Sequence, residues 1–130
     1  MTGKSPQRGV AEAILLPVRQ GYSLDVVDRA LAAGKISLAE LDRLVLPRKT
    51  LAHRRLLGSL TSDQSDRLSR LLRLIDHAEE TFGDSAKAHA WLRRPTPLLD
   101  GETPLDRLDT DFGSRQVEAM LGRIAHGLAV

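Results

Sequence analysis

Apolar residues along this chain recur at three- and four-residue steps, which is the spacing of amphipathic helices. The first clear run predicts a helix over residues 24–33, beginning after Ser23 and ending at Gly34, where a left-handed C-cap residue belongs. A weaker helix, residues 10–19, precedes it and is broken or kinked at Pro17. The pattern therefore predicts short helices separated by local stop signals.

Two more helices follow directly. Ser37 and Glu40 form a capping box, in which each side chain accepts the other's free backbone amide, and this predicts a helix over residues 38–45. Pro47 then interrupts the chain, and the next helix is expected from about residue 48 to residue 57.

The helices within residues 24–58 have the spacing of a helix-turn-helix, whose second helix enters the major groove of DNA. The candidate recognition helix is PRKTLAHRRLLG, and Leu51, Leu56 and Leu57 are expected to anchor it. One of its two adjacent arginines can form the forked contact to guanine that carries most specific readout. The residues left for phosphates and base edges are Arg48, Lys49, Thr50, His53, Arg54 and Arg55.

The alternative interpretation of this helix is a basic, solvent-facing helix in an ordinary bundle. Residues 46–60 contain no carboxylate, which favours DNA contact. The net charge is only +2, but residues 1–60 carry +5 and residues 61–130 carry −3. This division suggests one half that binds a polyanion and another half with a different contact, and a merely solvated surface is the alternative.

The second half begins with another capping box, formed by Thr61 and Gln64. It starts a long amphipathic helix that Gly83 ends, and its apolar stripe is either core or a dimer seam. The stripe consists of Leu68, Leu71, Leu72, Ile75, Ala78 and Phe82. A helix over residues 86–94 follows, with Trp91 expected as a core anchor. The last helix is predicted to be capped by Ser114.

Composition excludes several classes of protein. Aromatic residues make up only 3% of the chain, which disfavours a sheet-rich core, and an all-α fold is predicted. The absence of cysteine excludes disulfide scaffolds, Cys-ligated metals and thiol nucleophiles. The four histidines lack metal-ligand spacing, so no metal, cofactor or catalytic residue is expected. No membrane-spanning run or signal peptide is present, which suggests a cytoplasmic protein, and residues 1–9 are expected to be disordered.

Several stretches from Leu44 onward resemble the Xre/MbcA/ParS antitoxin family, the partners of RES-domain toxins in bacterial toxin–antitoxin operons. They are PRKTLAHRR, LTSDQSDRLSRLLRLIDHAEETFGD, KAHAWLRRP and LLDGETPLDRLDTDFGSRQVEAMLGRIAHG, within residues 44–127. The resemblance implies an N-terminal Xre-like helix-turn-helix that represses the protein's own operon. It also implies a small C-terminal helical domain that blocks the active site of a toxin that consumes NAD, and self-association into a homodimer or a larger complex.

Carried onto this chain, the resemblance divides it into a helix-turn-helix region, residues 10–60, and a dimerisation and toxin-binding region, residues 61–130. It implies toxin contacts in the loop of residues 95–103 and at the C-terminal end. The residues at that end are Arg123, His126, Gly127, Leu128, Ala129 and Val130. A plain dimeric helix-turn-helix regulator without a toxin is the alternative, and an adaptor that does not touch DNA is a third class.

Overall fold

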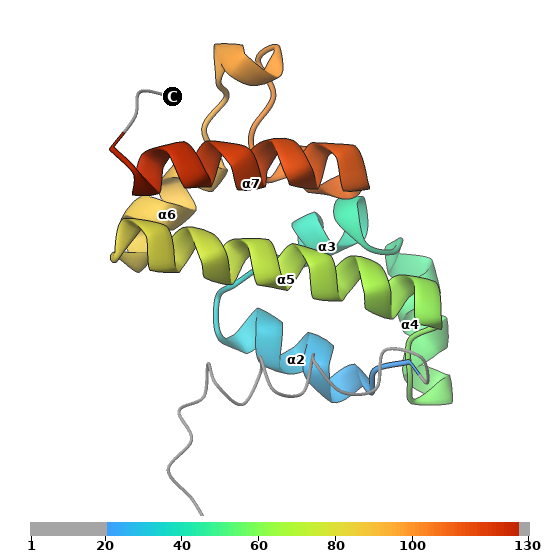
Figure 1. The fold of residues 1–130 in the computed structure, drawn as a ribbon. Helices are drawn as coiled ribbons and strands as arrows, with labels where there is room; N and C mark the ends of the chain where they lie inside the picture. Colours follow the sequence, from blue (N-terminus) through green and yellow to red (C-terminus); the bar gives the residue numbers. More distant parts are fainter. Residues whose placement is uncertain (1–20, 128–130) are drawn as a thin grey trace, which may run out of the picture. The chain divides into compact units, whose positions relative to one another are not determined.

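The computed structural model describes residues 21–127, in which six α-helices and two short 3₁₀ helices follow one another and no strand is formed (Figure 1). The prediction of an all-α fold is therefore confirmed. The expected helix over residues 10–19 and the expected disorder of residues 1–9 lie outside the described residues. The elements are α2 (Leu24–Ala32), α3 (Leu38–Leu44), α4 (Arg48–Leu57), α5 (Ser62–Phe82), α6 (Ser85–Leu92), η2 (Pro97–Leu99), η3 (Asp106–Asp109) and α7 (Asp111–Ala125).

The chain forms two compact units that divide between Leu72 and Arg73, inside α5. The first unit contains α2, α3, α4 and the first half of α5, and the second contains the rest of α5 and all that follows. None of the helices in the described range combines the length and the apolar character that crossing a membrane requires.

The local stop and start signals of the first unit lie where the sequence predicts them. Gly34 has a φ of 72° after α2, and its N–H donates to the Leu31 carbonyl at 3.1 Å, as in a Schellman C-cap. The Ser37–Glu40 capping box is formed, with both hydrogen bonds present at 3.0 and 3.1 Å. Gly58 is the left-handed C-cap of α4. These ends are predictable because the interactions that make them span only a few residues.

A short antiparallel contact connects the start of α2 to the start of α5. Ser23 and Ser59 form an isolated bridge, and the Leu60 N–H donates to the Tyr22 carbonyl at 2.8 Å. Tyr22 is fully buried, and its N–H donates to Ser65 Oγ at 2.8 Å. Gly21 has a φ of 83°, and a Cβ there would lie 2.1 Å from the Leu60 carbonyl oxygen. This close approach requires glycine.

The expectation that three leucines anchor α4 is wrong for two of them. Leu51 is buried, but Leu56 is 85% exposed and Leu57 is 57% exposed. At 100° per residue, positions five and six after Leu51 lie about 140° and 120° away from it, on opposite sides of the helix. Once Leu51 faces the core, Leu56 and Leu57 therefore face away from it.

The second unit has its core around the end of α5. The predicted apolar stripe of α5 has members in both units. Their side chains are buried, except that of Phe82, which is half-buried. Asp84 accepts the Lys87 N–H at 3.0 Å and starts α6, which ends at Leu92, two residues earlier than predicted. Trp91 is also half-buried, with its ring centroid 5.6 Å from that of Phe82.

The predicted cap of the last helix is wrong by four residues. Thr110 is the N-cap of α7, and its Oγ1 accepts the Gly113 N–H at 2.9 Å. Ser114 lies inside the helix, buried, and donates to the Thr110 carbonyl at 3.0 Å. Both hydroxyl residues satisfy the cap pattern in sequence, and packing selects Thr110, because Gly113 must lie against the backbone of Arg107.

Candidate functional sites

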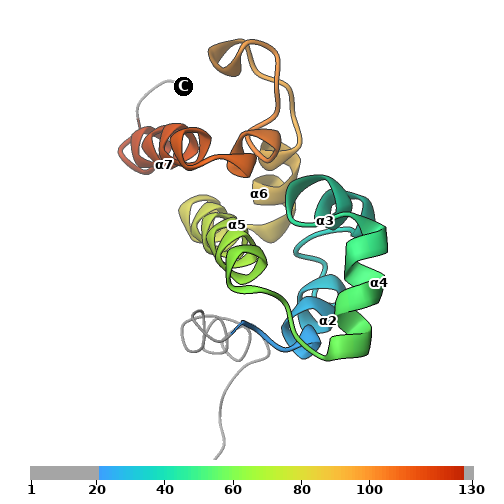
Figure 2. The same ribbon diagram turned by 90° about the vertical axis from the view of Figure 1, so that its right-hand side faces the viewer.

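The predicted DNA-contacting residues all lie on α4. This helix begins beside α3, where the Arg48 N–H donates to Asp42 Oδ1 at 2.7 Å. It ends beside the start of α2, where the Leu24 N–H approaches the Gly58 carbonyl at 3.4 Å (Figure 2). Helix α4 is thus fixed at both of its ends by neighbouring helices of its own unit.

The structure separates the predicted contacts into two groups. The side chains of Arg48, Lys49 and His53 are exposed, and none has an ion-pair partner among the described residues. Thr50 is half-buried on the same helix. This first group presents two permanent cations and an imidazole to solvent, which suits contact with phosphate oxygens.

The two adjacent arginines form the second group, because each already binds an acceptor within the first unit. Arg54 Nε donates to the Ser59 carbonyl at 2.7 Å. Arg55 binds Asp28 of α2 with both terminal nitrogens, at 2.9 and 3.4 Å. The hydrogen bond to Asp28 raises the pKa of the Arg55 guanidinium above its ordinary value. Arg55 therefore connects α4 to α2.

Sequence reasoning missed Asp28 and Asp42 as partners of α4. Asp28 lies 27 residues before Arg55, and no local spacing relates the two. Asp42 lies six residues before Arg48, whose N–H it accepts, and the Pro47 between them predicts only a helix break.

The predicted toxin-contacting residues lie at the end of α7. Arg123, His126 and Gly127 are all exposed, and Gly127 has a φ of 73°, which ends the helix. Leu128, Ala129 and Val130 lie outside the described residues. Arg123 has no ion-pair partner in the part of the chain that the structure describes.

The loop of residues 95–103, also predicted to face the toxin, folds back on itself through hydrogen bonds. The Thr96 N–H donates to the Glu102 carbonyl at 3.1 Å, and the Gly101 N–H donates to the Thr96 carbonyl at 3.0 Å. Within the loop, Leu99 is buried and Leu98 is 53% exposed. The loop thereby holds one apolar side chain inward and presents the next to solvent.

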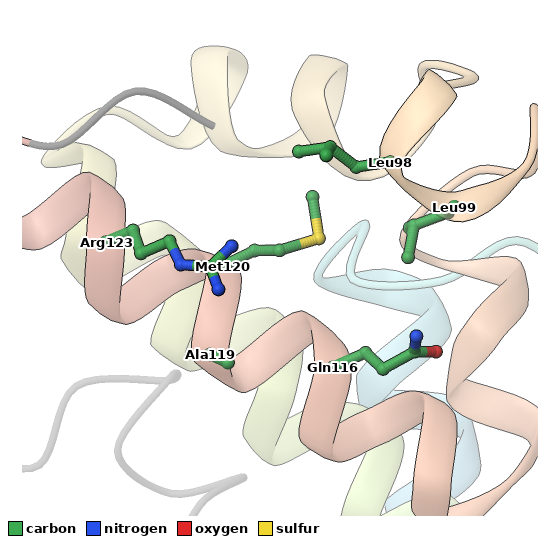
Figure 3. A pocket seen from close by; sticks show the side chains of 6 residues that line it. All are labelled: Leu98, Leu99, Gln116, Ala119, Met120 and Arg123. Atoms are coloured by element: carbon green, nitrogen blue, oxygen red, sulfur yellow. The ribbon is translucent and has the colours of Figure 1, made fainter.

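A hollow of about 200 Å³ lies between this loop and α7, which sequence reasoning did not find (Figure 3). Figure 3 shows the two leucines of η2 facing Met120 of α7, with Arg123 one turn further along the helix. The residues that line the hollow are Leu98, Leu99, Gln116, Ala119, Met120 and Arg123.

Arg107 supports one side of the hollow. Its Nε and Nη2 donate to Gln116 Oε1 at 3.2 and 2.6 Å, and its Nη1 donates to Glu102 at 3.4 Å. It therefore joins η3, the loop and α7, and it fixes the orientation of a residue that lines the hollow.

A hydrogen-bonded row of charged and imidazole groups connects α5 to α6. His89 Nε2 lies 2.6 Å from Glu79 Oε2, and Arg93 Nη1 lies 2.8 Å from His89 Nδ1. Because a guanidinium only donates, Nδ1 accepts and the proton is assigned to Nε2. In the described part of the chain, no three His, Asp or Glu side chains are placed to hold a metal ion. We interpret this row as a structural link.

Comparison with known proteins adds two matches to family models. Residues 13–73 match the antitoxin Xre-like helix-turn-helix domain, and residues 77–127 match the antitoxin Xre/MbcA/ParS C-terminal toxin-binding domain. All six residues that line the hollow lie within the second match. Both models describe parts of antitoxins, and neither describes an enzyme.

Three curated relatives agree with these matches. The chain is 33% identical to "Antitoxin Xre" of Yersinia enterocolitica, over 85% of this chain and 77% of the relative. It is 35% identical to "Antitoxin Xre" of Pseudomonas putida, over 85% of this chain and 69% of the relative. It is 31% identical to "Prs ADP-ribosylating antitoxin" of a Sphingobium species, over 52% of this chain and 48% of the relative.

Proposed function

We propose that this chain, which belongs to the Xre/MbcA/ParS antitoxin family, neutralises a RES-domain toxin by blocking the toxin's active site. We propose further that it represses its own operon. The observation that carries the proposal is the tandem match. A helix-turn-helix model covers residues 13–73, and a toxin-binding model covers residues 77–127. An antitoxin of this class needs one region that binds DNA and one region that binds the toxin.

For the DNA-binding region, residues 10–60, α4 is the proposed recognition helix. Arg48 and Lys49 are the proposed phosphate contacts, with His53 and Thr50 close to them on the same helix. Arg55 uses both terminal nitrogens on Asp28, so a forked contact to DNA would have to replace these hydrogen bonds and would add less net affinity than its charge suggests. Arg54 uses only Nε on the Ser59 carbonyl, which leaves its terminal nitrogens for a phosphate or a base edge.

For the toxin-binding and dimerisation region, residues 61–130, the proposed contacts are the loop of residues 95–103 and the C-terminal end. Arg123, His126 and residues 127–130 form the end that enters the toxin's active site. The relative named "Prs ADP-ribosylating antitoxin" supports a toxin that consumes NAD, since ADP-ribosyl transfer uses NAD as donor. The short apolar sequence of residues 128–130 is suited to block a pocket that otherwise admits NAD.

The deciding experiment is co-expression of this chain with the product of the adjacent gene, which the proposal expects to be a RES-domain toxin. We expect the two to co-purify and cellular NAD to stay at its uninduced level, whereas the toxin alone depletes NAD. Deletion of residues 127–130 is expected to restore depletion while the circular-dichroism spectrum keeps its helical shape. Full protection by the truncated chain would show that this segment does not block the active site.

A plain dimeric helix-turn-helix regulator without a toxin is the second candidate, and the basic exposed face of α4 favours it equally. The same experiment separates the two candidates. If no complex forms while the chain binds its own promoter with strong salt dependence, the regulator is the correct function.

A further inference from the structure

We infer that the hollow between η2 and α7 is an anchor site that takes one apolar side chain of the toxin, beside a toxin carboxylate that pairs with Arg123. The inference rests on the proposed function. It adds a second point of contact on the toxin, next to the C-terminal segment that blocks the active site, and Arg123 belongs to both contacts.

The volume of the hollow selects a side chain over a metabolite. Pockets for small molecules and cofactors typically measure about 300–1,000 Å³. The hollow measures about 200 Å³ and is open to solvent, which leaves room for one large apolar side chain and no cofactor. Leu98, Leu99, Ala119 and Met120 make its lining mostly apolar. Interfaces draw much of their binding energy from a buried apolar or aromatic anchor in such a pocket.

The walls of the hollow are fixed by the unit's own hydrogen bonds. Leu99 is buried, and the Leu99 N–H donates to the Thr96 carbonyl at 3.0 Å. Arg107 holds Gln116 from the other side through two hydrogen bonds. The side chains that form the walls are therefore already ordered before a partner binds, which lowers the entropy cost of binding.

The surface around the hollow indicates the chemistry of the partner. Phe112, Gln116, Ala119 and Arg123 follow one another at three- and four-residue steps, so they share one face of α7 over about 16 Å. Phe112 is 68% exposed, which is unusual for so large an apolar side chain because its contact with water is unfavourable. Arg123 has no partner among the described residues and supplies a positive charge at the other end. The complementary surface is apolar and carries one carboxylate.

Toxin is favoured over a second copy of this chain because the hollow lies wholly within residues 77–127, the stretch that matches a toxin-binding domain. The proposed active-site contact at the end of α7 begins with Arg123 itself. The hollow is therefore continuous with the proposed toxin interface.

The test measures the affinity of purified full-length variants for the product of the adjacent gene, the proposed RES-domain toxin, by calorimetry at two salt concentrations. Ala119→Phe fills the hollow from an exposed position and is expected to weaken binding at least tenfold. Ala90→Phe adds the same ring on an exposed alanine of α6 and is expected to change affinity less than twofold. Leu98→Glu, at a half-exposed loop position, is a second disruptive variant should Ala119→Phe fail to fold.

Charge is tested on the same helix. Arg123→Glu is expected to weaken binding at least tenfold at low salt, and less at high salt. Arg115→Glu, at another exposed position of α7 whose arginine pairs with Asp111, is the matched control and is expected to stay within twofold.

Three results would overturn the inference, and the last of them would overturn the proposed function as well. If wild-type chain binds toxin and the folded Ala119→Phe and Leu98→Glu variants bind it equally well, the hollow is not an anchor. If these variants only weaken self-association, measured by analytical ultracentrifugation, a second copy fills the hollow. If the wild-type chain itself does not bind the toxin, the proposed function fails and the inference fails with it.

Discussion

The packing of the second unit can be tested by replacing each of two glycines of α7 with alanine. The same substitution is expected to stabilise the protein at one position and to destabilise it at the other. Replacing a helical glycine by alanine normally stabilises a protein by about 1 kcal/mol. At Gly122 nothing lies within 4 Å of the added Cβ, so we expect this gain. At Gly113 the Cβ would lie 1.9 Å from the Arg107 carbonyl oxygen and 2.8 Å from its carbon.

The magnitude at Gly113 follows from that distance. To restore ordinary van der Waals contact, η3 and α7 must separate by about 1.5 Å. The obstacle is backbone, which cannot rotate away like a side chain, so we expect the upper end of the ~1–3 kcal/mol typical of overpacking. After the gain in helix propensity, Gly113→Ala should cost about 2 kcal/mol net, or roughly 8 °C in Tm. Gly122→Ala should raise Tm by roughly 4 °C.

Thermal unfolding followed by circular dichroism, with urea unfolding as a second measure, reports both variants against wild type. The separation also moves Arg107 away from Gln116, so Gly113→Ala is expected to weaken toxin binding more than its loss of stability explains. The reasoning is refuted if Gly113→Ala is as stable as Gly122→Ala, because the close approach of η3 to α7 would then impose no constraint.

Three further outcomes follow from the first unit. Asp28→Asn should lower the free energy of unfolding by about 0.5 kcal/mol in urea titrations, the value of a half-exposed ion pair with Arg55. The same change should tighten DNA binding in fluorescence anisotropy, and unchanged or weaker binding would contradict the idea that Asp28 competes with phosphate. Replacing Arg48 and Lys49 by alanine should reduce the slope of log K against log salt by about 0.9 for each lost phosphate contact, at unchanged Tm. Ser37→Ala should cost about 1 kcal/mol in urea unfolding, and no loss would mean that the capping box adds nothing to α3.

The sequence by itself determined where most helices of the first unit start and stop. The Ser37–Glu40 and Thr61–Gln64 capping boxes each join residues three apart, and both are formed. Gly34 ends α2 through hydrogen bonds to the helix's own last turn. Such signals can be recognised in one dimension because all their atoms come from one short stretch of chain. The family likeness, confirmed by the comparisons, likewise depends on short motifs in a fixed order.

Choice among equivalent local signals needed the tertiary structure. Thr110 and Ser114 both satisfy the cap pattern, and the contact of Gly113 with Arg107 places the start of α7 at the first of them. In α4 the helical spacing places Leu51, Leu56 and Leu57 on different faces, and only packing decides that Leu51 is the one that is buried.

The candidate sites show the same division. Composition and charge identified α4 as a basic helix, but only folding brought Asp28 to Arg55 and thereby separated the engaged arginines from the exposed Arg48 and Lys49. The hollow combines the loop of residues 97–99 with α7, segments between which the sequence has no periodic relation. Local hydrogen bonding and helical spacing were readable from the sequence because they act over three or four residues. Burial, ion pairing and concave surfaces depend on segments tens of residues apart, and only the packed chain decides them.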